Sequence, residues 1–126
     1  MTTRTSPLIH IALIVAIGLM LSGLVAAHAT LQKTQPASGK TVSAAPTDIQ
    51  LFFDEAVDLK VSKIALTGPS GPVMLGPTSA VNPKTLMAPI TGKLADGIYN
   101  VNWQTAAADD GHVSKGAFKF TLKQAH

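Results

Sequence analysis

A short acidic turn near the end of the chain carries side chains that could hold a metal ion. Asp110 and His112 are two residues apart, with Gly111 between them. A tight turn or an extended segment could aim both side chains at one point. Carboxylate and imidazole are both common ligands of first-row metals. The spacing therefore predicts half of a metal site at Asp110 and His112.

A further ligand depends on how the chain begins. Arg4 precedes residues 8–27, which are almost entirely apolar and end in the small residues of 25–27. This order is typical of a secretory signal peptide, so we expect residues 1–27 to be removed after Ala27 and the protein to be exported. A membrane anchor is the alternative. Cleavage after Ala29 is also acceptable and would discard His28.

Cleavage after Ala27 would make His28 the first residue of the mature chain. Its α-amino group and imidazole Nδ1 could then chelate one metal ion, which displaces their protons near neutral pH. With Asp110 and His112 the donor set becomes three nitrogens and one oxygen, which suits tetragonal Cu(II). Simpler interpretations stay open: a frayed terminus at His28, a backbone turn at Asp110-Gly111, and a surface histidine at His112.

Composition narrows the class of protein. Residues 28–126 carry nine Lys, no Arg and seven acidic residues, a formal charge of +2. The lysines are scattered along the sequence, so no nucleic-acid partner is expected. Cysteine is absent, which excludes disulfides, thiolate metal sites and a blue-copper centre.

Residues 28–126 are expected to form one all-β domain. Pro, Gly and Asn interrupt this part every eight to twelve residues, and several stretches alternate apolar and polar side chains. This pattern predicts about seven strands in a Greek-key β-sandwich or barrel, with the aromatic residues in its core. The expected strands are 29–35, 47–53, 63–67, 73–75, 86–90, 97–105 and 118–123.

Several blocks in the same order resemble the CopC/PcoC family of periplasmic copper-binding proteins, over nearly all of residues 28–123. The blocks are His28-Ala29, Thr34-Gln35-Pro36-Ala37 with Gly39, Ala45-Pro46, residues 49–55 (IQLFFDE), residues 97–103 (GIYNVNW), Asp110-Gly111-His112 and residues 116–120 (GAFKF).

This resemblance implies a cupredoxin-like, Ig-like Greek-key fold and one Cu(II) ion per chain. The implied ligands are His28, through its amine and imidazole, Asp110 and His112. Glu55 matches a family glutamate near the site and is expected in an outer-shell or axial role. Asp109 matches no family ligand and is expected to be a solvated turn residue.

Some members of the family carry a second site for Cu(I), built from a methionine-rich loop. The corresponding stretch here, residues 67–77, contains only Met74, and Met87 falls in an expected strand where core packing is its expected role. Because soft thioethers select Cu(I), no Cu(I) site is expected.

The resemblance implies a monomeric binding protein, not an enzyme, that captures Cu(II) for resistance, buffering or hand-over to a membrane copper transporter. An inner-membrane copper protein of the CopD type is the implied partner. Two alternatives remain from the residues alone. One is a monooxygenase with a copper brace, and the other is a metal-free structural or adhesive β-sandwich.

Overall fold

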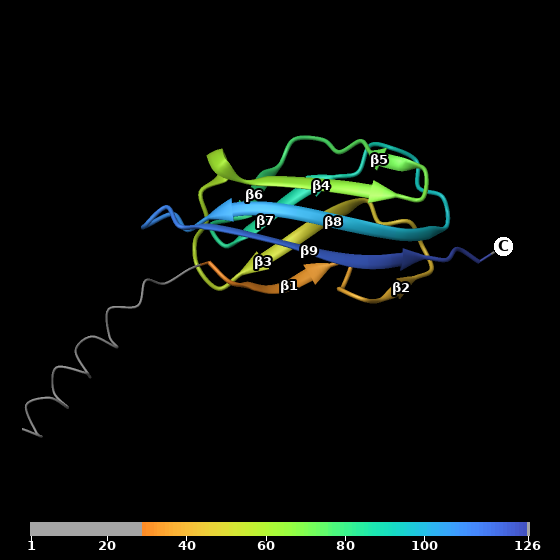
Figure 1. Ribbon diagram of the computed structural model, residues 1–126, viewed down its shortest axis with the longest axis horizontal. Helices are drawn as coiled ribbons and strands as arrows, with labels where there is room; N and C mark the ends of the chain where they lie inside the picture. The colour runs from red at the N-terminus through yellow and green to blue at the C-terminus, as the bar shows by residue number, and fades with distance from the viewer. Residues whose placement is uncertain (1–28, 126) are drawn as a thin grey trace, which may run out of the picture.

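A computed structural model describes residues 29–125 of the chain. These residues form a sandwich of two β-sheets (Figure 1). No helix within residues 29–125 is long and apolar enough to cross a membrane. The expected signal peptide, its cleavage point and His28 lie outside the described residues.

Nine strands make up the two sheets in the described part of the chain. One sheet has the order β1 (Leu31–Gln35), β3 (Asp48–Phe53), β7 (Thr85–Pro89) and β6 (Ser79–Asn82). The other has the order β2 (Thr41–Val42), β9 (Val113–Leu122), β8 (Gly97–Ala106), β4 (Lys63–Gly68) and β5 (Gly71–Val73). A short 3-10 helix, η1 (Leu59–Val61), precedes β4. Neighbouring strands are antiparallel except β2 and β9, which are parallel.

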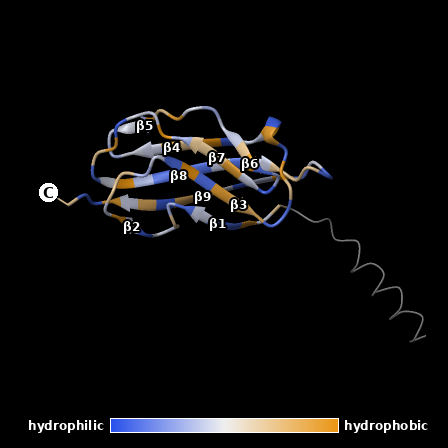
Figure 2. Ribbon diagram, turned by 180° about the vertical axis from the view of Figure 1, so that it is seen from behind, coloured by the Kyte–Doolittle hydropathy of each residue, from blue (hydrophilic) through white to orange (hydrophobic). Residues whose placement is uncertain are grey.

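Alternation along the strands builds the core between the sheets. Ile49, Leu51 and Phe53 of β3 are buried, while the residues between them are half-buried. Figure 2 shows this alternation as changes of colour along β3. Strands β8 and β9 bury every second residue over much of their length in the same way. The two-sheet all-β fold predicted from this period of two is confirmed.

Most aromatic rings occupy the core as predicted, but Phe52 is half-buried and faces outward from β3, where Lys33 lies 4.8 Å from the centre of its ring. Tyr99 stacks on Phe120 with ring centroids 5.2 Å apart, and Phe53 meets Trp103 edge-to-face at 5.3 Å. Such pairs stabilise a core beyond the area they bury.

The structure adds to the expected strands in two ways. The short strands β2 and β6 lie at sheet edges and were not predicted. Strand β9 begins at Val113, five residues before the expected start at Phe118. Its first half gives no apolar signal because Ser114 and Gly116 occupy the inward positions. Trp103 of β8 fills the space above Gly116, where an added Cβ would come within 2.6 Å of the indole ring.

One packing prediction is wrong. Met87 lies in β7 as expected, but Leu86 and Ala88 on either side of it are the residues that are fully buried. Met87 is half-buried and pairs in register with Gln50 and Ser79. Because side chains alternate along a strand, Met87 faces outward from the four-stranded sheet and is not part of the core.

Candidate metal centre

The turn between β8 and β9 carries the predicted Asp110 and His112. The two strands pair in register as far as Ala106 and Val113, and residues 107–112 connect them. Two backbone hydrogen bonds close this connection: Ala107 N–H donates to His112 O at 3.1 Å, and Gly111 N–H donates to Ala107 O at 3.0 Å. Gly111 has a φ of 72°, a left-handed conformation that glycine adopts without steric cost.

Within this turn, Asp110 and His112 contact each other. Oδ1 of Asp110 accepts a hydrogen bond from the backbone N–H of His112 at 3.0 Å. Oδ2 of Asp110 lies 3.3 Å from Nδ1 of His112, and both side chains are partly exposed. A carboxylate and an imidazole placed side by side could both donate to one metal ion. The structure thus brings these two predicted residues together.

The first described residues are held at the same end of the sandwich. Ala29 is buried, and its carbonyl accepts a hydrogen bond from Ser114 Oγ at 3.1 Å. Thr30 N–H donates to Oδ1 of Asp54 at 2.7 Å, and Asp54 N–H donates to Thr30 O at 3.0 Å. The start of the described chain is therefore fixed between the end of β3 and the start of β9.

Asp54 and Ser114 were not among the predicted site residues. Their partners lie 24 and 85 residues away in sequence. The one local signal was that Asp54 directly follows the apolar end of β3. Nothing in the sequence distinguishes Ser114 from other strand serines.

Glu55 lies beside the turn. It lines a hollow of about 440 Å³ together with Asp54, Ala56, Lys84, Ala108 and Asp109. The backbone joins the two segments, because Ala108 N–H donates to Ala56 O at 2.9 Å. Asp109 is exposed in this turn, as a solvated turn residue would be.

Residues 29–125 contain no group of three or more His, Cys, Asp or Glu side chains placed to hold a metal ion. Asp110 and His112 form a pair of nitrogen and oxygen donors that suits a first-row divalent metal.

A small two-sheet β domain with a His–Asp turn at one end is the class of protein that these features define. The model of the CopC domain matches residues 31–123. The chain belongs to the CopC domain family, so the resemblance found in the sequence is confirmed.

Named relatives fit this assignment. The chain is 34% identical to Protein YobA of Escherichia coli K12 over 100 residues, covering 77% of this chain and 80% of the relative. It is 32% identical to Copper resistance protein C of Pseudomonas syringae pv. tomato over 116 residues, covering 86% and 90%.

Two solved structures share the fold. PcoC, described as a methionine-rich copper resistance protein from Escherichia coli, has a TM-score of 0.68 and 33% identity, covering 77% of this chain and all of that one. CopC from Methylosinus trichosporium OB3b has a TM-score of 0.69 and 26% identity, covering 79% and 97%.

Proposed function

We propose that this protein captures one Cu(II) ion per chain at the β8–β9 end of the sandwich. The ligands are the amine and imidazole of His28, Asp110 and His112. One observation carries the proposal. The carbonyl of Ala29, the residue directly after His28, accepts a hydrogen bond from Ser114 Oγ, and Ser114 lies two residues from His112, the partner of Asp110.

The distances involved are short. His28 directly precedes Ala29 in the sequence, and consecutive Cα atoms are about 3.8 Å apart. Two residues of extended strand from Ser114 to His112 span about 7 Å. A histidine side chain and an α-amine at position 28 can bridge a gap of this size. The hydrogen bonds to Ala29 and Thr30 reduce the conformational freedom lost when the metal binds.

Glu55 is assigned an outer position. It lines the hollow next to the turn, where its carboxylate can attract the cation or approach it axially. Asp54 acts differently, because its side chain and backbone hold Thr30.

Family membership supports copper as the cargo, since relatives in Pseudomonas syringae and Escherichia coli are named copper resistance proteins. We propose that the protein is a periplasmic monomer that buffers Cu(II) or passes it to a CopD-type membrane protein. We assign no Cu(I) site. In the described residues, Met74 is an exposed residue after β5 and Met87 lies in the other sheet.

Binding is favoured over polysaccharide oxidation. An enzyme acting on a polysaccharide needs a broad surface on which sugar rings can stack. In this chain the single Trp and the single Tyr pack into the sandwich against Phe53 and Phe120.

The deciding experiment uses the exported protein. Intact mass identifies its first residue, and an EPR spectrum of the same sample reports the Cu(II) ligands. We expect a chain that starts at His28 and a tetragonal, nitrogen-rich spectrum at one copper per chain. The variant His112→Ala should weaken Cu(II) binding by at least a hundredfold, and the control His126→Ala should not. A chain that starts at Thr30 yet binds equally well would exclude His28 as a ligand.

A further inference from the structure

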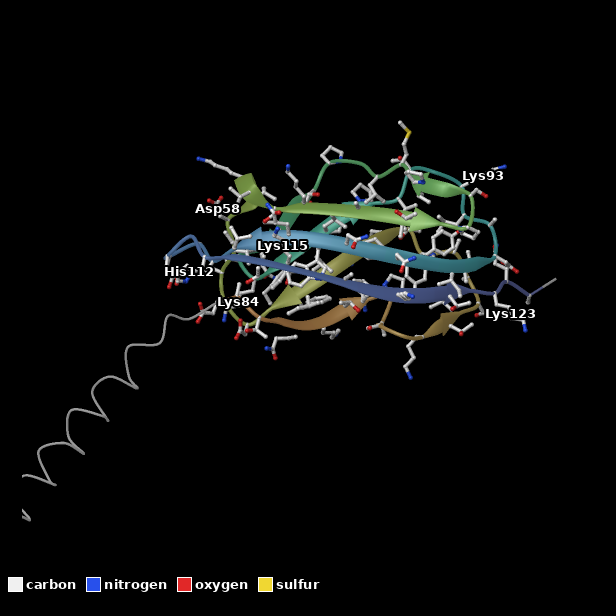
Figure 3. All side chains as sticks on the ribbon, in the orientation of Figure 1. Asp58, Lys84, Lys93, His112, Lys115 and Lys123 are labelled. Carbon is white, nitrogen blue, oxygen red and sulfur yellow. The ribbon has the colours of Figure 1, made fainter. Side chains whose placement is uncertain are left out.

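The outward face of the five-stranded sheet gathers lysines that are scattered in the sequence. Lys63 of β4, Gln104 of β8 and Lys115 of β9 form one register row across three strands. Two residues further along each strand, the next row consists of Ala65, Asn102 and Ala117. The third row consists of Thr67, Asn100 and Lys119. These strands lie at the front of Figure 1, and Figure 3 labels Lys115 on them.

No carboxylate lies in these rows. Asp58 is the N-cap of η1, where its side chain accepts a hydrogen bond from the backbone N–H of Lys60. Asp96 is hydrogen-bonded to Gln124 beyond the end of β9. Within residues 29–125, Lys63, Lys115 and Lys119 make no ion pair with an acidic residue. The charged side chains in these rows are therefore all cationic and the other positions are neutral, although the net charge of the whole chain is small.

The face is hollowed between its first two rows. A shallow depression of about 300 Å³ is lined by Lys63, Ala65, Asn102, Gln104 and Lys115, with Trp103 and Gly116. Small side chains such as Ala65 leave the space open, and the side-chain amides of Asn102 and Gln104 can donate hydrogen bonds. Ammonium and amide donors around a hollow suit a phosphate oxygen.

We propose that this lysine face, defined by Lys63, Lys115 and Lys119, docks on an anionic phospholipid membrane, with a headgroup phosphate in the hollow. Docking on a protein is disfavoured, because binding energy at protein interfaces comes mainly from Trp, Tyr and Arg. Residues 29–125 contain no Arg, and Tyr99 is buried. Trp103 borders the hollow, but its ring packs on Phe53 and Gly116. A face whose charged side chains are all lysines matches the negative surface potential of such a membrane.

This orientation would also determine where the β8–β9 turn, which carries the proposed copper ligands, lies relative to the membrane. Strands β8 and β9 would lie parallel to the membrane, so the turn that carries His112 would point along its surface (Figure 3). Copper could then be exchanged sideways with a protein embedded in the same membrane. The docking itself does not depend on copper.

Vesicle binding tests the proposal. The exported protein is sedimented with vesicles of phosphatidylglycerol and phosphatidylethanolamine, and with vesicles of phosphatidylcholine, at low and physiological salt. We expect binding to the anionic vesicles only, weakened by salt. The variant Lys63→Gln/Lys115→Gln/Lys119→Gln should reduce binding at least tenfold. The matched control Lys33→Gln/Lys84→Gln/Lys93→Gln removes the same charge elsewhere and should change binding less than threefold.

Three outcomes would overturn the proposal. One is the absence of binding to anionic vesicles at low salt. Another is an equal loss in both triple variants, which would show a net-charge effect. The third is competition by inorganic phosphate beyond that of chloride at equal ionic strength, which would assign the hollow to a free anion. Unchanged melting temperatures exclude unfolding of the variants.

Discussion

Asp54 and Thr30 hold each other by two hydrogen bonds. Thr30 N–H donates to Oδ1 of Asp54 at 2.7 Å, and Asp54 N–H donates to Thr30 O at 3.0 Å. This pair joins the end of β3 to the residues that directly follow His28. The proposed copper site therefore depends on a contact that contains no copper ligand.

Loss of the Asp54 carboxylate should loosen the start of the mature chain. We expect Asp54→Ala to lower Cu(II) affinity about tenfold, because more chain entropy is lost when His28 binds the metal. Competition with a chelator of known affinity measures the change.

Asp96→Ala is the matched control for Asp54→Ala. Asp96 also accepts a hydrogen bond from a backbone N–H, that of Gln124, but beyond the other end of β9. Its loss should leave copper affinity within about twofold. Equal weakening by both substitutions would show that Asp54 acts only through general stability.

Asp110 and Asp109 offer an adjacent pair of carboxylates for comparison. Asp110→Asn keeps an oxygen for the backbone N–H of His112 but removes the negative charge beside its ring. We expect Cu(II) affinity to fall by tenfold or more, with an altered EPR spectrum, and the free energy of unfolding of the metal-free protein to change by less than about 0.5 kcal/mol. Asp109→Asn should change neither property, and if it instead weakened binding as much as Asp110→Asn, the ligand assignment would be wrong.

Gly116 should be intolerant of any side chain. A Cβ at this position would come 2.6 Å from Cζ2 and 2.8 Å from Cε2 of Trp103. Gly116→Ala must displace the indole ring and is expected to destabilise the fold by about 1–3 kcal/mol. Chemical denaturation followed by fluorescence of this single Trp measures the loss. Ala117→Ser, at the neighbouring outward position, serves as the control and should have little effect.

Tyr99 should titrate at unusually high pH. Burial raises the pKa of Tyr99, and the charge of Asp96 raises it further. Because the folded state holds this proton more tightly than the unfolded state, stability is fully present below about pH 10 and falls as the pH rises above it. Tyr99 is the only tyrosine, so absorbance near 295 nm reports its ionisation alone. Ionisation near pH 10 in the still-folded protein would contradict the prediction.

Much of the fold was predictable from the sequence because strand alternation is a local signal. Six of the seven expected strands are present near their predicted bounds, and Ile49, Leu51 and Phe53 are buried as their spacing indicates. The seventh, expected at 73–75, is displaced to β5 (Gly71–Val73). Strands β2 and β6 escaped prediction, since a strand of two residues and an exposed edge strand show no clear alternation. Met87 was wrongly predicted to lie in the core, because a shift of one residue along a strand moves a side chain to the other face of the sheet.

The sequence by itself determined that Asp110 and His112 lie together, because both belong to one short turn. Only the tertiary structure decided what surrounds them. The contacts of Asp54 with Thr30 and of Ser114 with Ala29 join residues far apart in the chain. The lysine face arises because antiparallel register aligns β4, β8 and β9. Such contacts depend on how strands pair, and no local pattern of residue types specifies that pairing.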